Sequence, residues 1–143
     1  MMRFMVLVYP EGFDKAEPDF APPPESVAAM MKFNEELQKA GVLLSLDGLH
    51  PPTMGARVRF GDGSPKVTYG PFPESRESLG GHWMIRVNSL DDAIGWMKRC
   101  PMYGNCVVEI RQLYEMEEFP DDVRAAAGDA PARLKETLEG KAE

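Results

Sequence analysis

The chain has 143 residues with 23 acidic and 16 basic side chains, which gives a formal net charge of -7. This length predicts one domain that buries a core without disulfides or metals, and a hydrophobic fraction of 43% excludes wholesale disorder. Because an acidic chain without a cluster of lysines and arginines is repelled by phosphate backbones, nucleic acid is not expected as a partner.

The first segment predicts a strand and neither an export signal nor a membrane span. Arg3 to Tyr9 is rich in β-branched and aromatic residues and stops at Pro10, which is typical of a strand covered on both faces. The start of the chain lacks a basic leader with a long apolar run, and no segment approaches the roughly 20 apolar residues of a membrane helix. We therefore expect a cytoplasmic protein without a membrane partner.

A proline-rich loop over residues 10–24 precedes a predicted helix from Glu25 to Ala40, which Gly41 ends. The residues at helical spacing that should form its buried stripe are Val27, Met30, Met31, Asn34 and Leu37. We interpret Met30 and Met31 as core filler, since methionine adapts to irregular gaps.

The middle of the chain predicts a strand from Val42 to Leu49 and then a small hairpin. The hairpin strands, Ala56–Phe60 and Lys66–Tyr69, flank Gly61–Ser64, which has the glycine and aspartate that tight hairpin turns need. No helix pattern follows this turn, so we interpret it as a hairpin and not as a phosphate-binding loop.

The second half repeats the order strand, helix, strand. Gly80–Val87 alternates as a strand does, Ser89 and Asp92 have capping-box spacing, and Cys106–Tyr114 predicts the last strand. The expected buried stripe of the intervening helix is Leu90, Ala93, Ile94 and Met97. From Glu117 on, the chain is acidic and rich in alanine, which predicts one or two short surface helices.

This order predicts an α+β fold, namely a ferredoxin-like βαββαβ domain with a β-hairpin insertion. Its sheet should be antiparallel, with both helices on one face. Residues 1–119 form the predicted domain, and residues 120–143 form an acidic, alanine-rich helical extension.

Two-residue alternation sorts the side chains of each strand into two faces. The purely apolar sets, which should face the helices, are Phe4, Val6 and Val8, then Trp83, Ile85 and Val87, then Val108 and Ile110. The opposite sets are Arg3, Met5, Leu7, Tyr9, His82, Met84, Arg86, Glu109 and Arg111. Because so apolar a face would expose a large hydrophobic patch, we expect a second copy of the chain to cover it in a homodimer.

Two interpretations of the charged residues on this second face stay open. Glu109 and Arg111 either make structural ion pairs at the dimer interface or line a small-molecule pocket with His82 and Arg86. His82 is the candidate acid or base because histidine is the residue type that most readily exchanges protons in catalysis, and it would need Glu109 or Glu74 within hydrogen-bond reach.

The cysteines and histidines predict neither a metal site nor a cofactor. Cys100 and Cys106 form no C-x-x-C pair, so free thiols in a reducing compartment are expected. His50 precedes two prolines in a loop, where a histidine is normally exposed, and its spacing from His82 does not support a metal ligand set.

The segment from Tyr69 to Glu77, Y-G-P-F-P-E-S-R-E, is followed by Gly80–Gly81. It resembles the D-G-P-F-x-E-x-K-E…G-G signature of the YCII-related, DGPF-domain family, and the resemblance extends over residues 3–119. The resemblance implies a dimeric α+β barrel of ferredoxin-like halves. Family members are mostly uncharacterised, and some are encoded beside extracytoplasmic-function sigma factors. The wider superfamily includes a dehydrochlorinase and members proposed to use a His-Asp pair.

The chain departs from the family pattern at three positions. Tyr69 stands in place of the leading aspartate, Arg76 in place of lysine, and His82 in place of an aromatic residue. The resemblance therefore carries over no catalytic acid, although Tyr69 can still donate a hydrogen bond to a ligand. The motif also has a structural interpretation, in which Gly70–Pro71 is a turn and Phe72 fills the space between sheet and loop.

Two functions stay open. The first is a homodimeric domain that binds a small molecule or a regulatory partner, and the loss of the motif aspartate favours it. The second is a cofactor-free lyase or isomerase acting on a small aromatic or carboxylated substrate, which arginine side chains suit because they pair well with carboxylates. The residues expected to bind a ligand are Tyr9, Tyr69, Glu74, His82, Arg86, Glu109 and Arg111, with His82 and Glu74 as the catalytic candidates.

Overall fold

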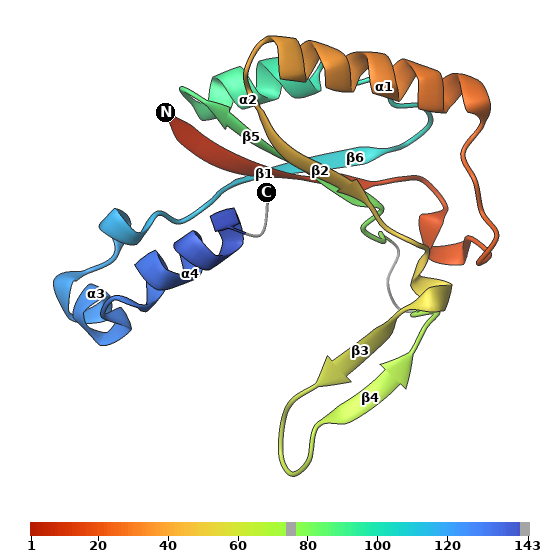
Figure 1. The fold of residues 1–143 in the computed structure, drawn as a ribbon. Helices are drawn as coiled ribbons and strands as arrows, with labels where there is room; N and C mark the ends of the chain where they lie inside the picture. The colour runs from red at the N-terminus through yellow and green to blue at the C-terminus, as the bar shows by residue number, and fades with distance from the viewer. Residues whose placement is uncertain (74–76, 141–143) are drawn as a thin grey trace. The chain divides into compact units, whose positions relative to one another are not determined.

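The computed structural model describes residues 1–73 and 77–140, and the chain divides into two units, Met1–Leu113 and Tyr114–Glu143. The first unit contains a four-stranded sheet in the order β2-β5-β1-β6 and a two-stranded sheet of β3 and β4 (Figure 1). The strands are β1 Met2–Tyr9, β2 Leu43–Gly48, β3 Ala56–Arg59, β4 Lys66–Tyr69, β5 Gly81–Val87 and β6 Val107–Gln112. The α-helices are α1 Pro24–Lys39, α2 Leu90–Met97, α3 Asp121–Ala127 and α4 Ala130–Gly140. All strand pairs are antiparallel, so the predicted α+β class with an antiparallel sheet is confirmed.

Helices α1 and α2 lie together on one face of the four-stranded sheet (Figure 1). The buried side chains of the core are Phe4, Val6, Val8, Phe33, Leu37, Trp83, Ile85, Val87, Ala93 and Met97. They include every residue of β1 and β5 that alternation assigned to the helix side, and Val108 and Ile110 of β6 pack against them. The predicted division of the strands into two faces is therefore confirmed.

The first half of α1 contributes less to the core than its periodicity predicts. Met30 packs against the core, but Val27 is 38% exposed and Met31 is 54% exposed. The interpretation of Met31 as core filler is wrong, because this half of α1 covers a cavity and not the sheet. Phe33, which the predicted stripe omits, is buried instead.

Helix α2 begins with the predicted cap. The Ser89 hydroxyl accepts a hydrogen bond from the backbone N–H of Asp92 at 3.1 Å, which satisfies a donor that the first turn leaves free. Ala93 and Met97 are buried as predicted, whereas Leu90 is 49% exposed and its predicted burial is wrong. Leu90 is the first residue of the helix, and helical side chains lean towards the N-terminus, so it extends past the part of α2 that packs on the sheet.

The predicted hairpin forms as β3 and β4, with Val58 opposite Val67 and Arg59 opposite Lys66. It extends away from the four-stranded sheet, and each of its strand residues is exposed (Figure 1). Alternation gives it one apolar face and one basic face.

The motif around Gly70 has a structural role at the base of this hairpin. A Cβ atom on Gly70 would overlap the carbonyl oxygen of Pro52, so only glycine fits there. Phe72 is buried, and the guanidinium of Arg57 lies 4.0 Å from the centroid of its ring. Phe72 is thus a packing residue, in agreement with the structural interpretation of the motif.

The second unit, Tyr114–Glu143, contains α3 and α4 in the segment predicted to be helical. Neither helix has a buried residue in its described part. The rings of Tyr114 and Phe119 pack with centroids 5.1 Å apart, and Arg133 pairs with Asp129 at 3.3 Å. Across residues 1–73 and 77–140, no helix has the length and apolar character needed to cross a membrane.

Candidate functional site

A cavity of about 420 Å³, called the end cavity below, lies where β1 and β2 finish and β5 begins. Its walls come from the first half of α1, the loop after β1, the end of β2 and the segment 101–106 that follows α2. A short 3-10 helix, Phe13–Lys15, turns the loop after β1 and places Phe13 in the wall. Segments far apart in sequence therefore build the cavity, and no local pattern predicts it.

The walls of the end cavity are largely apolar. Phe13 is buried and packs edge-to-face with Phe20, with ring centroids 5.8 Å apart. The other large apolar side chains of the wall include Met30, Met31, Leu46, Leu49 and Met102. Small-molecule sites are typically apolar cavities of roughly 300–1,000 Å³ with a few polar groups, and the end cavity fits this description.

The buried polar side chain of the end cavity is Asn34 on α1, which is 9% exposed. The indole N–H of Trp83 on β5 donates a hydrogen bond to Oδ1 of Asn34 at 2.7 Å. Because an indole can only donate, this bond fixes the amide with its oxygen toward Trp83. The amide N–H₂ group contacts the thioether sulfur of Met31 at 3.9 Å, which is a weak acceptor. Asn34 thus offers donors to a bound molecule.

One rim of the end cavity is held by Glu11. Its carboxylate accepts hydrogen bonds from the backbone N–H of Asn105 at 3.0 Å and from the side-chain amide of Asn105 at 3.1 Å. These two bonds, the backbone one first, hold the pKa of Glu11 below its ordinary value. Gly104 has a φ of +66°, and a Cβ there would also meet the Glu11 carboxylate, so the loop requires glycine. The contact joins the loop after β1 to the segment after α2.

His82 on β5 and Asp47 on β2 lie opposite each other beside the end cavity, and alternation directs both side chains to the face of the sheet away from α1 and α2. Directly opposed residues of an antiparallel pair have Cβ atoms roughly 4.5–5.5 Å apart, which brings a carboxylate near the imidazole. A register shift between Leu43 and Ser45 puts Asp47 opposite His82. Sequence analysis missed Asp47 because nothing in the residues of β2 reveals this shift.

The acid partner proposed from the sequence, Glu109, lies farther from His82. Leu7 of β1 pairs with His82 on one side and with Glu109 on the other. Two strand spacings of roughly 4.8 Å each therefore separate the backbones of the two residues. The other proposed partner, Glu74, lies outside the described residues.

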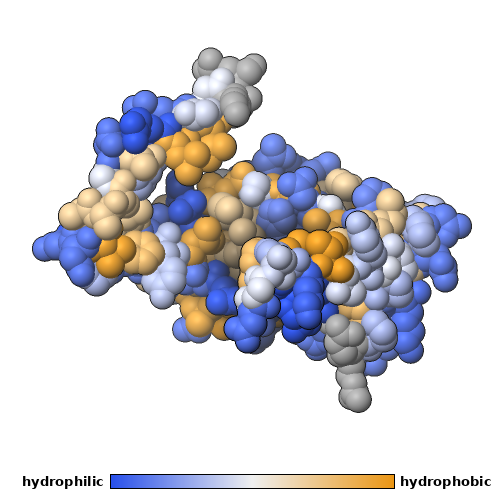
Figure 2. Space-filling view, turned by 90° about the horizontal axis from the view of Figure 1, so that it is seen from below, coloured by the Kyte–Doolittle hydropathy of each residue, from blue (hydrophilic) through white to orange (hydrophobic). Residues whose placement is uncertain are grey.

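The face of the sheet away from the helices, called the open face below, carries Met5, Leu7 and Met84 in its middle. These side chains are partly exposed, and neither α1 nor α2 covers them. The space-filling view from below shows this side of the molecule, with hydrophobic and hydrophilic side chains intermingled (Figure 2).

The predicted ligand residues are distributed over different parts of the first unit. His82 lines the end cavity, whereas Glu109 and Arg111 are exposed on the edge strand β6. Tyr9 is at the end of β1, and Tyr69 is 79% exposed at the end of β4. None of the ion pairs found between described residues involves Glu109 or Arg111.

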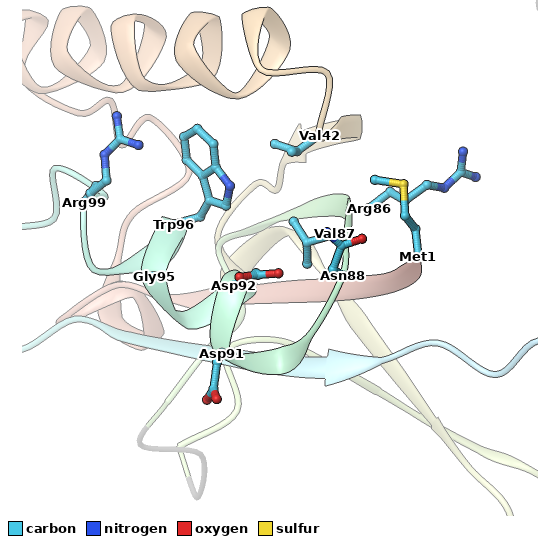
Figure 3. A pocket seen from close by; sticks show the side chains of 10 residues that line it. All are labelled: Met1, Val42, Arg86, Val87, Asn88, Asp91, Asp92, Gly95, Trp96 and Arg99. Carbon is cyan, nitrogen blue, oxygen red and sulfur yellow. The ribbon is translucent and has the colours of Figure 1, made fainter.

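Arg86, the remaining predicted ligand residue, lines a second hollow of about 350 Å³ near the N-terminus (Figure 3). Arg99 lies in the same hollow, where it pairs with Glu36 at 2.5 Å and lies over the ring of Trp96, 4.6 Å from its centroid. Arg99, one of the two arginines of this hollow, is thus already paired, and the lining of the hollow also contains Asp91 and Asp92. The end cavity is the better candidate site.

Neither cysteine is placed as a nucleophile. Both thiols are free, and Cys106 lies in the wall of the end cavity with its sulfur 3.5 Å from that of Met102. Burial, and to a lesser extent the proximity of Cys106, raises the pKa of Cys100 to about 12, and burial also raises the pKa of Cys106. Both are neutral thiols near pH 7, and the thiolate is the reactive form. Within the described part of the chain, no three His, Cys, Asp or Glu side chains group as metal ligands.

Residues 2–117 match the family model described as YCII-related domain. This span contains the whole four-stranded sheet, both helices that cover it and the hairpin. The chain is also similar to "Uncharacterized protein R00369" of Rhizobium meliloti (strain 1021), with 34% identity over 86 residues. That alignment covers 57% of this chain and 69% of the relative. The chain therefore belongs to the YCII-related domain family, as the resemblance of its Gly70–Phe72 motif predicted.

Proposed function

We propose that this chain is a homodimeric, cytoplasmic small-molecule-binding domain whose ligand occupies the end cavity. The observation that carries the proposal is the cavity itself, which combines a volume of about 420 Å³ and apolar walls with the buried amide of Asn34. Buried polar groups in an apolar cavity normally orient a bound molecule. Among the described members of the predicted ligand set, His82 is the one that lines this cavity.

The proposed fold is the ferredoxin-like one, and the strand order supports it. Strands β1 and β2 flank β5 and are joined by α1, while β5 and β6 flank β1 and are joined by α2. Each half is thus a strand, helix, strand unit with a strand of the other half inserted between its two strands.

The proposed dimer places the open faces of two copies against each other. Met5, Leu7 and Met84 form an apolar centre that neither α1 nor α2 covers, and burying it would remove apolar surface from water. Glu109 and Arg111 lie two residues apart on β6, so a twofold axis can bring the carboxylate of one copy to the guanidinium of the other. The predicted role of Glu109 and Arg111 in ligand binding stays open as an alternative to this interface role.

Ligand binding is tested by thermal shift with a panel of small neutral and charged aromatic compounds. Val27→Trp should fill the end cavity and abolish the shift, because Val27 lies in its wall. Lys32→Trp, an exposed position of the same helix outside the wall, should keep it. Arg111→Ala should also keep the shift, and its loss in that variant would move the ligand site to the open face.

Dimerisation is tested by sedimentation equilibrium. Met84→Lys should raise the dimer dissociation constant by at least about tenfold, because it puts a charge at the centre of the proposed interface. Met31→Lys, which changes an exposed methionine of α1 in the same way, should not. A wild-type chain that stays monomeric at micromolar concentrations contradicts the dimer.

The opposition of His82 and Asp47 favours a second candidate function, a cofactor-free lyase or isomerase that acts where these two side chains meet beside the end cavity. The imidazole would remove a proton from a carbon beside a carbonyl group, and Asp47 would orient the ring. The test is deuterium incorporation into the methyl group of acetophenone in D₂O, followed by NMR. If the wild-type chain catalyses exchange and His82→Gln abolishes it, the enzyme is supported. If exchange is no faster than in D₂O without protein, small-molecule binding stays as the one proposed function.

A further inference from the structure

The charges around the end cavity restrict what it can hold. Its described lining contains two histidines, His50 and His82, and two acidic residues, Glu11 and Asp47, but no lysine or arginine. Glu11 is held in its ionised form by Asn105, since those hydrogen bonds lower its pKa. A carboxylate ligand would therefore lose its hydration near the ionised Glu11 and without a lysine or arginine to pair with, which is unfavourable.

Asn34, the buried polar residue of the end cavity, offers hydrogen-bond donors to a ligand. Oδ1 of Asn34 is committed to the indole N–H of Trp83, and that indole cannot act as an acceptor. The contact of the amide N–H₂ group with the Met31 sulfur at 3.9 Å is weak, so a stronger acceptor can replace it. A carbonyl or ether oxygen is such an acceptor.

The remaining wall is suited to a flat, apolar body. Phe13 and Phe20 meet edge-to-face, and Trp83 and Tyr103 add two further aromatic side chains. Methionines such as Met30 and Met102 complete the wall, and their flexible thioethers fit around the edges of rings.

From these observations we infer that the end cavity binds a neutral, ring-containing compound whose carbonyl or ether oxygen accepts a hydrogen bond from the amide of Asn34, and that it rejects carboxylates. The inference rests on the proposed function and specifies its ligand class. It departs from the carboxylated substrates considered from the sequence, because Arg86 and Arg111 are not part of this cavity.

Three probes of nearly the same shape test the inference on the wild-type protein. Acetophenone is neutral and has an acceptor, α-methylstyrene is neutral without one, and benzoate is the corresponding anion. Their dissociation constants, measured by calorimetry or thermal shift, should rank in this order, with benzoate at least about tenfold weaker than acetophenone. Equal binding of acetophenone and α-methylstyrene would overturn the role of the acceptor.

Asn34→Asp extends the test to the protein. The carboxylate can still accept the Trp83 hydrogen bond, but it has no N–H to donate, so acetophenone should lose most of its shift. The near-ultraviolet circular dichroism of the two tryptophans, Trp83 and Trp96, checks that the variant is folded. If benzoate binds wild type best, the ligand class is wrong while the binding function stands. If none of the three probes and no panel compound binds, the binding function fails as well.

Discussion

The two faces of the four-stranded sheet are made by the same strands, yet they are buried in different ways. On the helix-covered face, Val6 and Ile85 have no exposed surface. On the open face, their sequence neighbours Met5 and Met84 stay partly exposed. The comparison teaches that this chain completes one apolar core with α1 and α2 and leaves a second apolar surface uncovered by them, which we assign to a second copy.

The sharpest test of this difference compares two adjacent residues of β5. Ile85→Ala should lower the free energy of unfolding by about 2–5 kcal/mol, because it opens a void in a fully buried site. Met84→Ala should change stability in a way that depends on protein concentration, since its packing partner would be another copy. Urea unfolding at low and high protein concentration measures the effect of each substitution. If the effect of Ile85→Ala also varied with concentration, the two faces would not be separate.

The covered face contains one polar pair, Asn34 with Trp83, and breaking it should have the next largest effect. Asn34→Leu leaves the indole N–H buried without its acceptor and should lower the free energy of unfolding by about 1–3 kcal/mol. Trp83→Phe removes the donor, so the double variant should lose less than the sum of the two single variants. A double-mutant cycle by urea unfolding measures this coupling. Strict additivity would show that the hydrogen bond contributes nothing to stability.

Alternation alone was sufficient to predict which side chains of β1 and β5 face the helices. A pleated strand leaves no other choice once Phe4, Val6 and Val8 are recognised as the apolar set. The cap at Ser89 was equally local, since it depends on residues three apart. Features that depend on a few neighbouring residues are therefore well predicted from the sequence.

The candidate site was predicted less well because it depends on distant segments. The periodicity of α1 gives the direction of Met31 but not whether sheet or cavity lies beneath it. Asp47 faces His82 only because of the register shift in β2, which its residues do not reveal. The burial of Asn34 follows from its place in the predicted stripe of α1, but its hydrogen-bond partner, Trp83, lies on β5 and could not be predicted from that pattern.

A smaller effect is expected where α2 begins on the covered face. Ser89→Ala removes the hydroxyl that accepts from the Asp92 N–H and should lower the free energy of unfolding by about 1 kcal/mol. Ser45→Ala is the matched control, because Ser45 is exposed on β2 and does not cap a helix. Thermal unfolding of both variants at one protein concentration is sufficient. Equal midpoints for the two variants would contradict the role of the cap.

The smallest effect is expected at the rim of the end cavity, where Glu11 joins two loops. Its pKa is lower in the folded chain than its ordinary value of 4.5, so its carboxylate stabilises the fold fully above that value. This contribution should disappear as the pH falls through the lowered pKa, since the protonated group binds Asn105 less well. Wild type should therefore be slightly more stable than Glu11→Gln near neutrality, and the difference should vanish in acid.

The effect of Glu11 is measured by urea unfolding from neutral pH down to a pH below the lowered pKa of Glu11. Glu17→Gln, in the same loop, is the control. Hydrogen exchange at the Asn105 amide gives a second, local measurement, because that N–H donates to Glu11 at 3.0 Å. Its exchange should speed up in Glu11→Gln even where global stability hardly changes, since an exposed contact protects a loop more than it stabilises the fold. Unchanged exchange would mean that the segment after α2 keeps its place without Glu11, and that the rim of the end cavity is held by packing alone.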